Sequence, residues 1–247
     1  MSLSRVVGFE FPADFDTASF DAVNDQVASI ANPNDLAAPW KKNAWFNHGA
    51  AWNGLAYRLR SAVEYNEEFG RLIALSTSPP PDERYSQERA LFGCIASSLS
   101  AIDCFYMATY CVATALSPEH FQLRQEEHLN KTPREIADAY HAWQPSDEFS
   151  KLLSNVAKSD EYKKLKNLRN ALAHRGTLPR QHFFSTVSDV PSAIPSNPKA
   201  LGGDFDYTAS LSDATTSIHT QWLCHTASQL VSEFNRFLVR HPQGERA

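Results

Sequence analysis

Apolar side chains recur every three or four residues along several long stretches of the chain, which is the spacing of one face of an amphipathic α-helix. The first stretch covers residues 44–76 and is followed by three consecutive prolines at 79–81, which cannot continue a helix. The second covers residues 82–116 and predicts a rod of roughly 50 Å. A helix of that length needs an antiparallel neighbour to cover its apolar face.

Shorter helices are expected between residues 117 and 145. There, Thr132 is suited to cap a helix that has Pro133 at its first position and Glu135 closing a capping box. A further helical region spans residues 146–175, either continuous or interrupted near Ser159, whose side chain is suited to cap a new helix. The stretch from 117 to 145 is therefore predicted to be a helical insertion or crossover.

The last helical stretch covers residues 212–240, where apolar positions alternate at spacings of four and three, as in the seam of a bundle helix. Residues 177–209 contain four prolines and predict a long loop or small hairpin, and residues 1–40 predict an arm with at most one short helix. We therefore predict an all-α protein: an up-and-down four-helix bundle over residues 41–247, with a helical insertion, a long loop before the last helix and an N-terminal arm.

Composition supports a folded helical protein. Hydrophobic residues make up 43% of the 247 positions, which excludes a disordered chain, and only nine residues are glycine, which disfavours glycine-lined nucleotide loops. No uninterrupted apolar run approaches the roughly 18 residues of a membrane span, and the N-terminus has no signal-peptide core. The four cysteines form no CxxC pair. We expect a soluble cytoplasmic protein with no membrane association.

Positive charge is concentrated in one segment. The formal net charge is −5, but residues 158–180 hold seven cations against two acids, so this segment carries +5 and the remainder −10. Lys163, Lys164 and Lys166 lie on successive faces of the predicted helix, so they cannot all contact one nucleic-acid strand. Two interpretations stay open for these lysines: a solvated helix face, or contacts to an RNA backbone.

Common metal, phosphate and nucleophile motifs are missing from the sequence. No glutamate has a histidine three residues later, as di-iron bundles require, and no histidine pair has the zinc spacing of four. The phosphate loops GxxxxGK[ST] and GxGxxG and the nucleophile elbow GxSxG are also missing. We therefore expect neither a metal nor an organic cofactor.

One polar segment stands out at the end of the third long helical region, with the sequence Leu-Arg-Asn-Ala-Leu-Ala-His-Arg-Gly at residues 168–176. The guanidinium of Arg169 can hold a phosphate through two hydrogen bonds, and the imidazole of His174 can move a proton near neutral pH. Asn170 shares a helix face with His174, four residues later. A plainer interpretation is that Arg169 and His174 only stabilise the negative end of a helix dipole.

This segment resembles the Arg-x4-6-His motif of the HEPN superfamily (higher eukaryotes and prokaryotes nucleotide-binding). The close match covers about 15 residues, and the helical order extends it over residues 44–240. The resemblance implies a helical bundle that dimerises with both motifs facing one cleft, and in many members a metal-independent endoribonuclease. It further implies that Arg169 holds the scissile phosphate, His174 deprotonates the ribose 2′-hydroxyl and Asn170 orients phosphate or imidazole, which leaves a 2′,3′-cyclic phosphate.

The family also tends to carry a polar residue on the second helix near the motif. Asp103 is our candidate, with a carboxylate on the flank of an apolar stripe as the alternative interpretation, and Glu88 is a weaker candidate. RNA or phosphate binding is expected from Arg175, Lys166 and Lys163.

The expected partners are RNA or a nucleotide, a second copy of the chain in a homodimer, and an antitoxin or another partner protein. The five tryptophans are expected in the core or a subunit interface, or as base-stacking platforms. Three hypotheses follow: a HEPN-type ribonuclease in a toxin-antitoxin or defence setting, a non-catalytic HEPN binding module, or a structural helical protein.

Overall fold

The computed structural model describes six stretches of the chain, with the side chains of residues 39–41 and of His174 excepted: residues 11–13, 15–30, 39–75, 80–123, 130–174 and 211–241. Within these stretches the protein is all-helical, with 86% of the residues in helices and no strand. The helices are α1 (Thr17–Ile30), α2 (Pro39–Leu75), α3 (Pro81–Leu116), α4 (Pro133–Trp143), α5 (Glu148–Lys158), α6 (Asp160–His174) and α7 (Ala214–Arg240). The predicted all-α class is confirmed.

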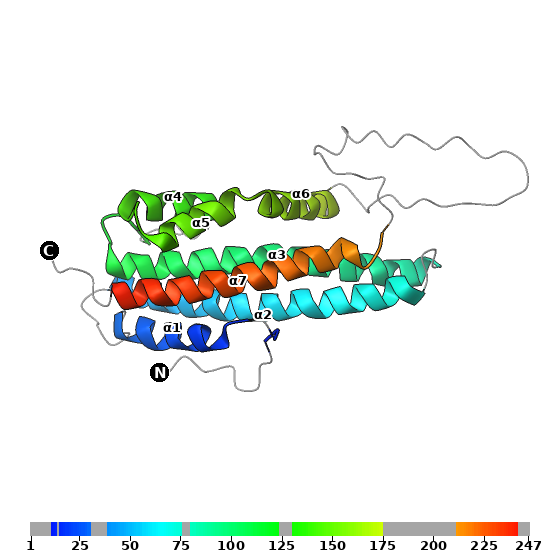
Figure 1. Ribbon diagram of the computed structural model, residues 1–247, viewed down its shortest axis with the longest axis horizontal. Helices are drawn as coiled ribbons and strands as arrows, with labels where there is room; N and C mark the ends of the chain where they lie inside the picture. The colour runs from blue at the N-terminus through cyan, green and yellow to red at the C-terminus, as the bar shows by residue number, and fades with distance from the viewer. Residues whose placement is uncertain are drawn as a thin grey trace, which may run out of the picture.

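The three longest helices, α2, α3 and α7, run side by side along the long axis of the molecule (Figure 1). Helices α4, α5 and α6 form a row along one side of α3, and α1 lies on the other side of the molecule against α7. Helix α6 runs in the opposite direction to α3, so its C-terminal end approaches the beginning of α7 (Figure 1). This arrangement places the polar segment of α6 beside α3.

Glycine allows α2 and α3 to approach closely. A Cβ atom at Gly93 of α3 would lie 2.7 Å from the ring of Tyr65 on α2, and one at Gly54 of α2 would lie 2.9 Å from Cys104 Sγ on α3. Because real Cβ atoms do not come so near to other atoms, the Tyr65 ring can lie against the α3 backbone only while residue 93 has no side chain. The extensive contact between α2 and α3 therefore depends on these two small residues.

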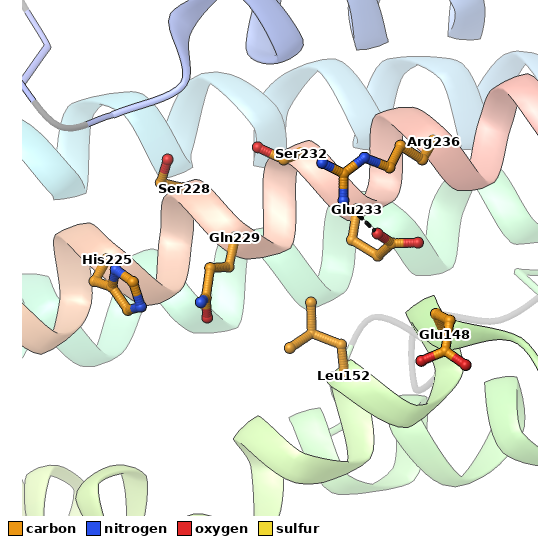
Figure 2. Close-up of a pocket in the computed structure, with 8 residues that line it drawn as sticks. All are labelled: Glu148, Leu152, His225, Ser228, Gln229, Ser232, Glu233 and Arg236. Carbon is orange, nitrogen blue, oxygen red and sulfur yellow. Dashed lines mark hydrogen bonds and ion pairs between the residues drawn. The ribbon is translucent and has the colours of Figure 1, made fainter.

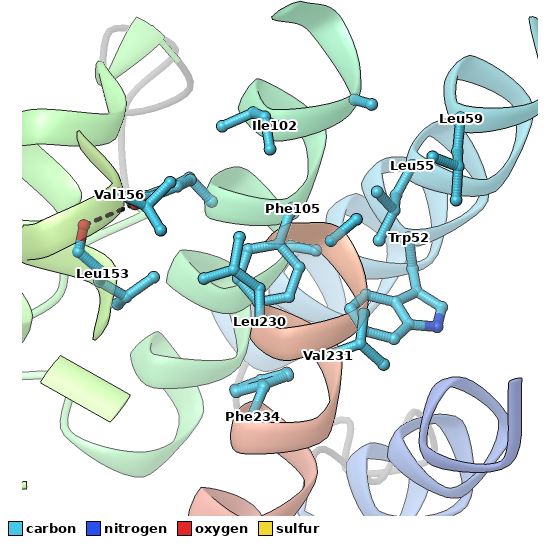
Figure 3. Packing of buried hydrophobic residues seen from close by; sticks show 14 of the residues in the cluster. Trp52, Leu55, Leu59, Ile102, Phe105, Leu153, Val156, Leu230, Val231 and Phe234 are labelled. Atoms are coloured by element: carbon cyan, nitrogen blue, oxygen red, sulfur yellow. Dashed lines mark hydrogen bonds between the residues drawn. The ribbon is translucent and has the colours of Figure 1, made fainter. Parts of the chain in front are cut away.

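Aromatic rings pack among aliphatic side chains in the core, where Figure 3 shows Trp52, Phe105 and Phe234 beside leucine, isoleucine and valine. Trp52 is fully buried and stacks on Phe20 of α1 with 4.7 Å between ring centroids, while Phe105, Phe149 and Phe234 bring α3, α5 and α7 together. Trp45 is also buried, and Trp143 and Trp222 pack against the core, as expected for tryptophans in the core; the side chain of Trp40 lies outside the described residues. These rings therefore tie α1, α2, α3, α5 and α7 into one hydrophobic cluster.

The short helix expected in the N-terminal arm is α1, and it packs into the shared core. Its side chains Phe20, Val23 and Val27 are buried, and just before it the Asp16 amide donates to Ser228 Oγ of α7 over 3.0 Å. The next helix, α2, begins at Pro39, earlier than the expected start at residue 44, because proline fits the first turn of a helix without loss of a hydrogen bond.

Local capping signals decide where the middle helices begin. The Thr132–Glu135 capping box at the start of α4 is present as predicted. The interruption near Ser159 is also present: Ser159 Oγ accepts a 3.1 Å hydrogen bond from the Tyr162 amide, so α5 ends and α6 begins at this residue. The loop expected at 177–209 and the glycine cap at Gly176 lie outside the described residues.

Helix α3 is long and apolar enough to cross a membrane by length and composition alone, but 61% of its most apolar window is buried inside the protein. A central core helix needs the same apolar surface, and α3 contacts α1, α2, α4, α6 and α7. Its apolar character is thus accounted for by burial.

Candidate functional site

The candidate site lies where α6 packs against α3. The hydroxyl of Tyr162, near the start of α6, donates a 3.4 Å hydrogen bond to Asp103 Oδ1 on α3. Tyr162 is fixed at this level because its own amide is bound by Ser159 at the helix start, and its ring is largely buried. The contact therefore joins the predicted residue Asp103 to the helix that carries the predicted motif.

Asp103 is an exposed residue of α3, yet its carboxyl is desolvated by the neighbouring side chains. This desolvation raises the pKa of Asp103 above its ordinary value, and the hydrogen bond from Tyr162 and the charges of Arg169 and Lys166 oppose the rise. Desolvation and the charge of Asp103 together raise the pKa of the Tyr162 hydroxyl. Asp103 thus lies within the electrostatic reach of both cations.

Lys166 and Arg169 share the Tyr162 face of α6, because they follow Tyr162 by four and seven residues. Neither cation forms an ion pair or a hydrogen bond with any residue that the structure describes. Arg169 is half-buried and Lys166 is exposed. Within the described part of the chain, two cations therefore flank one carboxylate without direct contact to it, so they can attract an anion.

The neighbouring lysines have different surroundings. Lys163 forms a 3.0 Å ion pair with Asp160 in the first turn of α6, so its charge is directed to that residue and not to Asp103. Lys164 acts on the other side of the helix, where its charge adds to desolvation in lowering the pKa of His219 on α7. The three lysines diverge, as their spacing predicts, and of the three only Lys166 is coupled to Asp103.

The structure describes only some of the remaining predicted site residues. Asn170 is half-buried on the last turns of α6, and the helix continues to His174, whose side chain lies outside the described residues together with Arg175. The approach of His174 to Arg169 therefore stays a prediction. Glu88 lies on α3 about 22 Å from Asp103 along the helix axis, so the fold does not bring it to the Tyr162–Asp103 contact.

Sequence reasoning missed Tyr162. The sequence does contain a signal for it. Tyr162 follows the capping residue Ser159 by three positions and precedes Lys166 by four, so it lies on the same face of the helix as Lys166. The sequence does not say where α6 packs along the axis of α3, and this position puts Tyr162 opposite Asp103.

A separate surface groove of about 460 Å³ lies between α7 and α5 (Figure 2). It is lined by Glu148, Leu152, His225, Ser228, Gln229, Ser232, Glu233 and Arg236, and it contains none of the predicted site residues. Its main charges are already paired: Glu233 contacts Arg236 over 2.9 Å and Arg240 over 3.0 Å. The groove therefore offers less unpaired charge to a ligand than the α3–α6 contact.

Across the stretches that the structure describes, no group of three or more histidine, cysteine or acidic side chains could hold a metal ion. The four cysteines, Cys94, Cys104, Cys111 and Cys224, are free thiols.

No protein-family model, no curated protein and no solved structure matches this chain. Its function must therefore be inferred from the site residues themselves.

Proposed function

We propose that this protein is a metal-independent endoribonuclease of the HEPN type. The observation that carries the proposal is the pair of cations, Arg169 and Lys166, that lie beside Asp103 without a described ion-pair partner, on the helix that leads directly into Asn170 and His174. An RNA phosphate is an anion that a guanidinium can grip at two oxygens. The surrounding chain is acidic, so the positive charge is local to this helix.

The proposed reaction needs only RNA and water. Arg169 binds the scissile phosphate, and His174 takes the proton of the ribose 2′-hydroxyl. The 2′-oxygen then bonds to phosphorus, the bond from phosphorus to the 5′-oxygen breaks, and that oxygen takes a proton from water. The hydroxide that is left takes the proton held by His174, so the histidine is restored and no water is consumed. The products are a 2′,3′-cyclic phosphate and a 5′-hydroxyl. Asn170 orients the phosphate or the imidazole, and Arg175 binds the RNA backbone.

Asp103 serves in this proposal as a positioning residue. Its charge acts on Arg169 without a direct ion pair, and the Tyr162 hydroxyl limits where its carboxylate can turn. A direct Asp103–Arg169 pair would compete with phosphate for the guanidinium. The arrangement therefore favours an arginine that is held near its place but remains open to RNA.

The same proposal includes the assembly. Helices α2, α3 and α7 and the interrupted helical region α5–α6 form the four-helix bundle, α4 lies in the insertion over residues 117–145, and two copies dimerise with their α6 ends facing one cleft. A C-terminal helix end repels anions through its dipole, so two Arg169/His174 pairs bind phosphate better than one. We place this enzyme in the cytoplasm, in a toxin-antitoxin or defence setting with an antitoxin or similar partner protein.

The test is cleavage of single-stranded RNA by the purified protein in EDTA, with the product ends identified chemically. His174→Ala should lower the rate by about 10²- to 10⁴-fold with an unchanged melting temperature, as expected for loss of a general base. The matched control is His141→Ala, which removes an exposed histidine of α4 and should cleave normally.

Three outcomes would contradict the proposal. Normal cleavage by His174→Ala would exclude the assigned base. RNA binding without any cleavage by the wild type would favour a non-catalytic HEPN module. Unfolding of His174→Ala would favour the interpretation that the histidine only stabilises the helix end.

A further inference from the structure

Helix α3 has an exposed stripe on the side next to α6. We call it the α3 stripe and define it by Phe92, Ala96, Ser100 and Asp103, which follow one another at three or four residues and are exposed or half-buried. Neighbouring faces of α3 are covered: Gly93 and Cys104 meet α2, and Cys94 lies 3.4 Å from Thr220 of α7. The stripe is thus the face that the described helices leave open near the candidate site.

Phe92 is 42% exposed on this stripe, although α3 is the central helix of the core. It lies 11 residues before Asp103, which is three turns and about 16 Å along the same face. Helix α6 runs the other way, so Arg169 lies about 10 Å and the helix end about 18 Å beyond Tyr162. Phe92 is therefore level with the last turns of α6, where the proposed chemistry takes place.

The surroundings of Phe92 differ from those of the exposed Phe46. No other aromatic ring in the described part of the chain contacts Phe92, whereas the exposed Phe46 has the ammonium of Lys42 5.9 Å from its ring centre. Cations border both sides of the stripe, with Lys166 and Arg169 on α6 and Arg58 of α2 close enough to Cys104 to lower its pKa against the effect of burial. The cations therefore lie toward the Asp103 end of the stripe and the exposed ring lies at the other end, so the stripe offers phosphate contacts and a flat apolar surface about 16 Å apart.

We propose that Phe92 is a stacking platform for an unpaired nucleobase of the RNA. This inference rests on the proposed ribonuclease function and adds a base-binding residue to it. The face of a base is free to stack only when the base is unpaired, since in a duplex both faces are covered by neighbouring pairs. Lys166 and Arg169 hold phosphates at the Asp103 end of the stripe, while a base farther along the same strand rests on Phe92. The described tryptophans do not supply this platform, because Trp45 and Trp52 are buried and Trp143 and Trp222 pack against the core.

The test measures binding of a fluorescent 12-nucleotide RNA with 2′-fluoro groups, which cannot be cleaved through a 2′-hydroxyl, by anisotropy. The same strand annealed to its complement is the second probe. Phe92→Ala should weaken binding of the single strand by about five- to 150-fold, the range for loss of one base–aromatic stack, and duplex binding by less than about twofold. Phe92→Tyr should bind the single strand like the wild type. Phe46→Ala is the matched control, because it removes an exposed ring near the start of α2, the end of α2 that lies away from the end of α6, and should change nothing.

Each contrary result has a distinct meaning. Unchanged binding of the single strand by Phe92→Ala, or an equal loss for both probes, would overturn the stacking role while leaving the ribonuclease proposal intact. A change of oligomeric state in Phe92→Ala, measured by light scattering, would show instead that the ring belongs to a protein interface. If the wild type binds neither probe, the proposed function itself fails and the stacking role fails with it.

Discussion

The Tyr162 hydroxyl and the Asp103 carboxylate lie 3.4 Å apart, across 59 residues of sequence, and each affects the other's proton affinity in the opposite sense. The hydrogen bond from Tyr162 lowers the pKa of Asp103, while the charge of Asp103 raises the pKa of Tyr162. Because the pair joins α3 to α6, it also fixes the level at which Lys166 and Arg169 lie along α3. The geometry of the candidate site thus depends on one contact between a helix start and a helix middle.

Tyr162→Phe should raise the pKa of Asp103. The variant loses the hydrogen bond that lowers this pKa, while the desolvation that raises it remains. Carboxyl ¹³C NMR of the wild type and the variant across pH 3 to 8 measures this directly. Tyr85→Phe, which changes an exposed tyrosine near the start of α3, is the control. An Asp103 pKa that stays constant or falls in Tyr162→Phe would show that the hydrogen bond does not form in solution.

Arg169→Lys should lose most of the RNA cleavage although the charge is kept. Lysine offers a point charge without the planar fork that grips two phosphate oxygens. Cleavage and binding of the uncleavable RNA are measured separately, and binding should weaken less than cleavage. Full activity of Arg169→Lys would mean that the arginine acts only as diffuse positive charge.

Lys166→Ala and Lys163→Ala should differ, although the two residues are only three positions apart. Lys166 is coupled to Asp103 and has no direct partner in the described structure, whereas Lys163 is paired with Asp160. Lys166→Ala should therefore weaken RNA binding and reduce the slope of log K against log salt by about 0.7, as for one lost single-strand phosphate contact. Lys163→Ala should leave that slope unchanged. Equal slopes for both variants would contradict the assignment of Lys166 to the site.

The helical pattern of the sequence predicted most of the fold because long apolar periods and capping residues are local signals. The ends of α3, the capping box at Thr132 and the interruption at Ser159 all follow from side chains within one turn. The burial of α1 did not follow, because its 14 residues gain their packing from α7, which is about 200 residues away in the sequence. For that reason the sequence predicts only an arm with at most one short helix over residues 1–40.

The sequence could predict only those site residues that lie together in one contiguous helical motif. Arg169, Asn170 and His174 lie in one motif, and Asp103 was proposed through a family resemblance. Tyr162 reaches Asp103 through the antiparallel placement of α6 on α3, which periodicity alone does not determine, and the proposed role of Phe92 depends on the same placement. Whether Lys163 or Lys166 faces Asp103 likewise depends on the rotation of α6 about its axis.

The stability of the protein should fall between pH 6.5 and pH 4 because of His48. Burial lowers the pKa of this side chain from 6.5 to about 4, and its Nδ1 lies 3.1 Å from the Ala108 carbonyl. The unfolded chain therefore takes up a proton on His48 in this range before the folded chain does, so stability is lost as the pH falls. Below pH 4 the free energy of unfolding is lower by about 3 kcal/mol because of this histidine.

Carboxyl groups also change protonation toward acidic pH and affect stability. Urea unfolding at pH 7 and pH 4.5 in the wild type and in His48→Gln separates the contribution of His48 from theirs. The variant should show a smaller difference in unfolding free energy between the two pH values. An equal difference in both proteins would mean that His48 is not buried in its neutral form.

Two glycines of the α2–α3 pair should respond oppositely to the same substitution. At Gly93 a Cβ would lie 2.7 Å from the Tyr65 ring, whereas at Gly70 the nearest atom is Asp213 Cβ at 3.9 Å, an ordinary contact. Gly93→Ala should destabilise the protein by about 1–3 kcal/mol through overpacking, and Gly70→Ala should stabilise it by about 0.5–1 kcal/mol, because alanine loses less entropy than glycine in a helix. Thermal and urea unfolding measure both changes.

Adding Tyr65→Leu to Gly93→Ala should restore part of the lost stability, since the smaller side chain makes room for the new methyl group. No recovery of stability in the double variant would contradict a direct clash. Because Gly93 is next to Phe92, Gly93→Ala should also weaken single-strand RNA binding, with partial recovery in the same double variant.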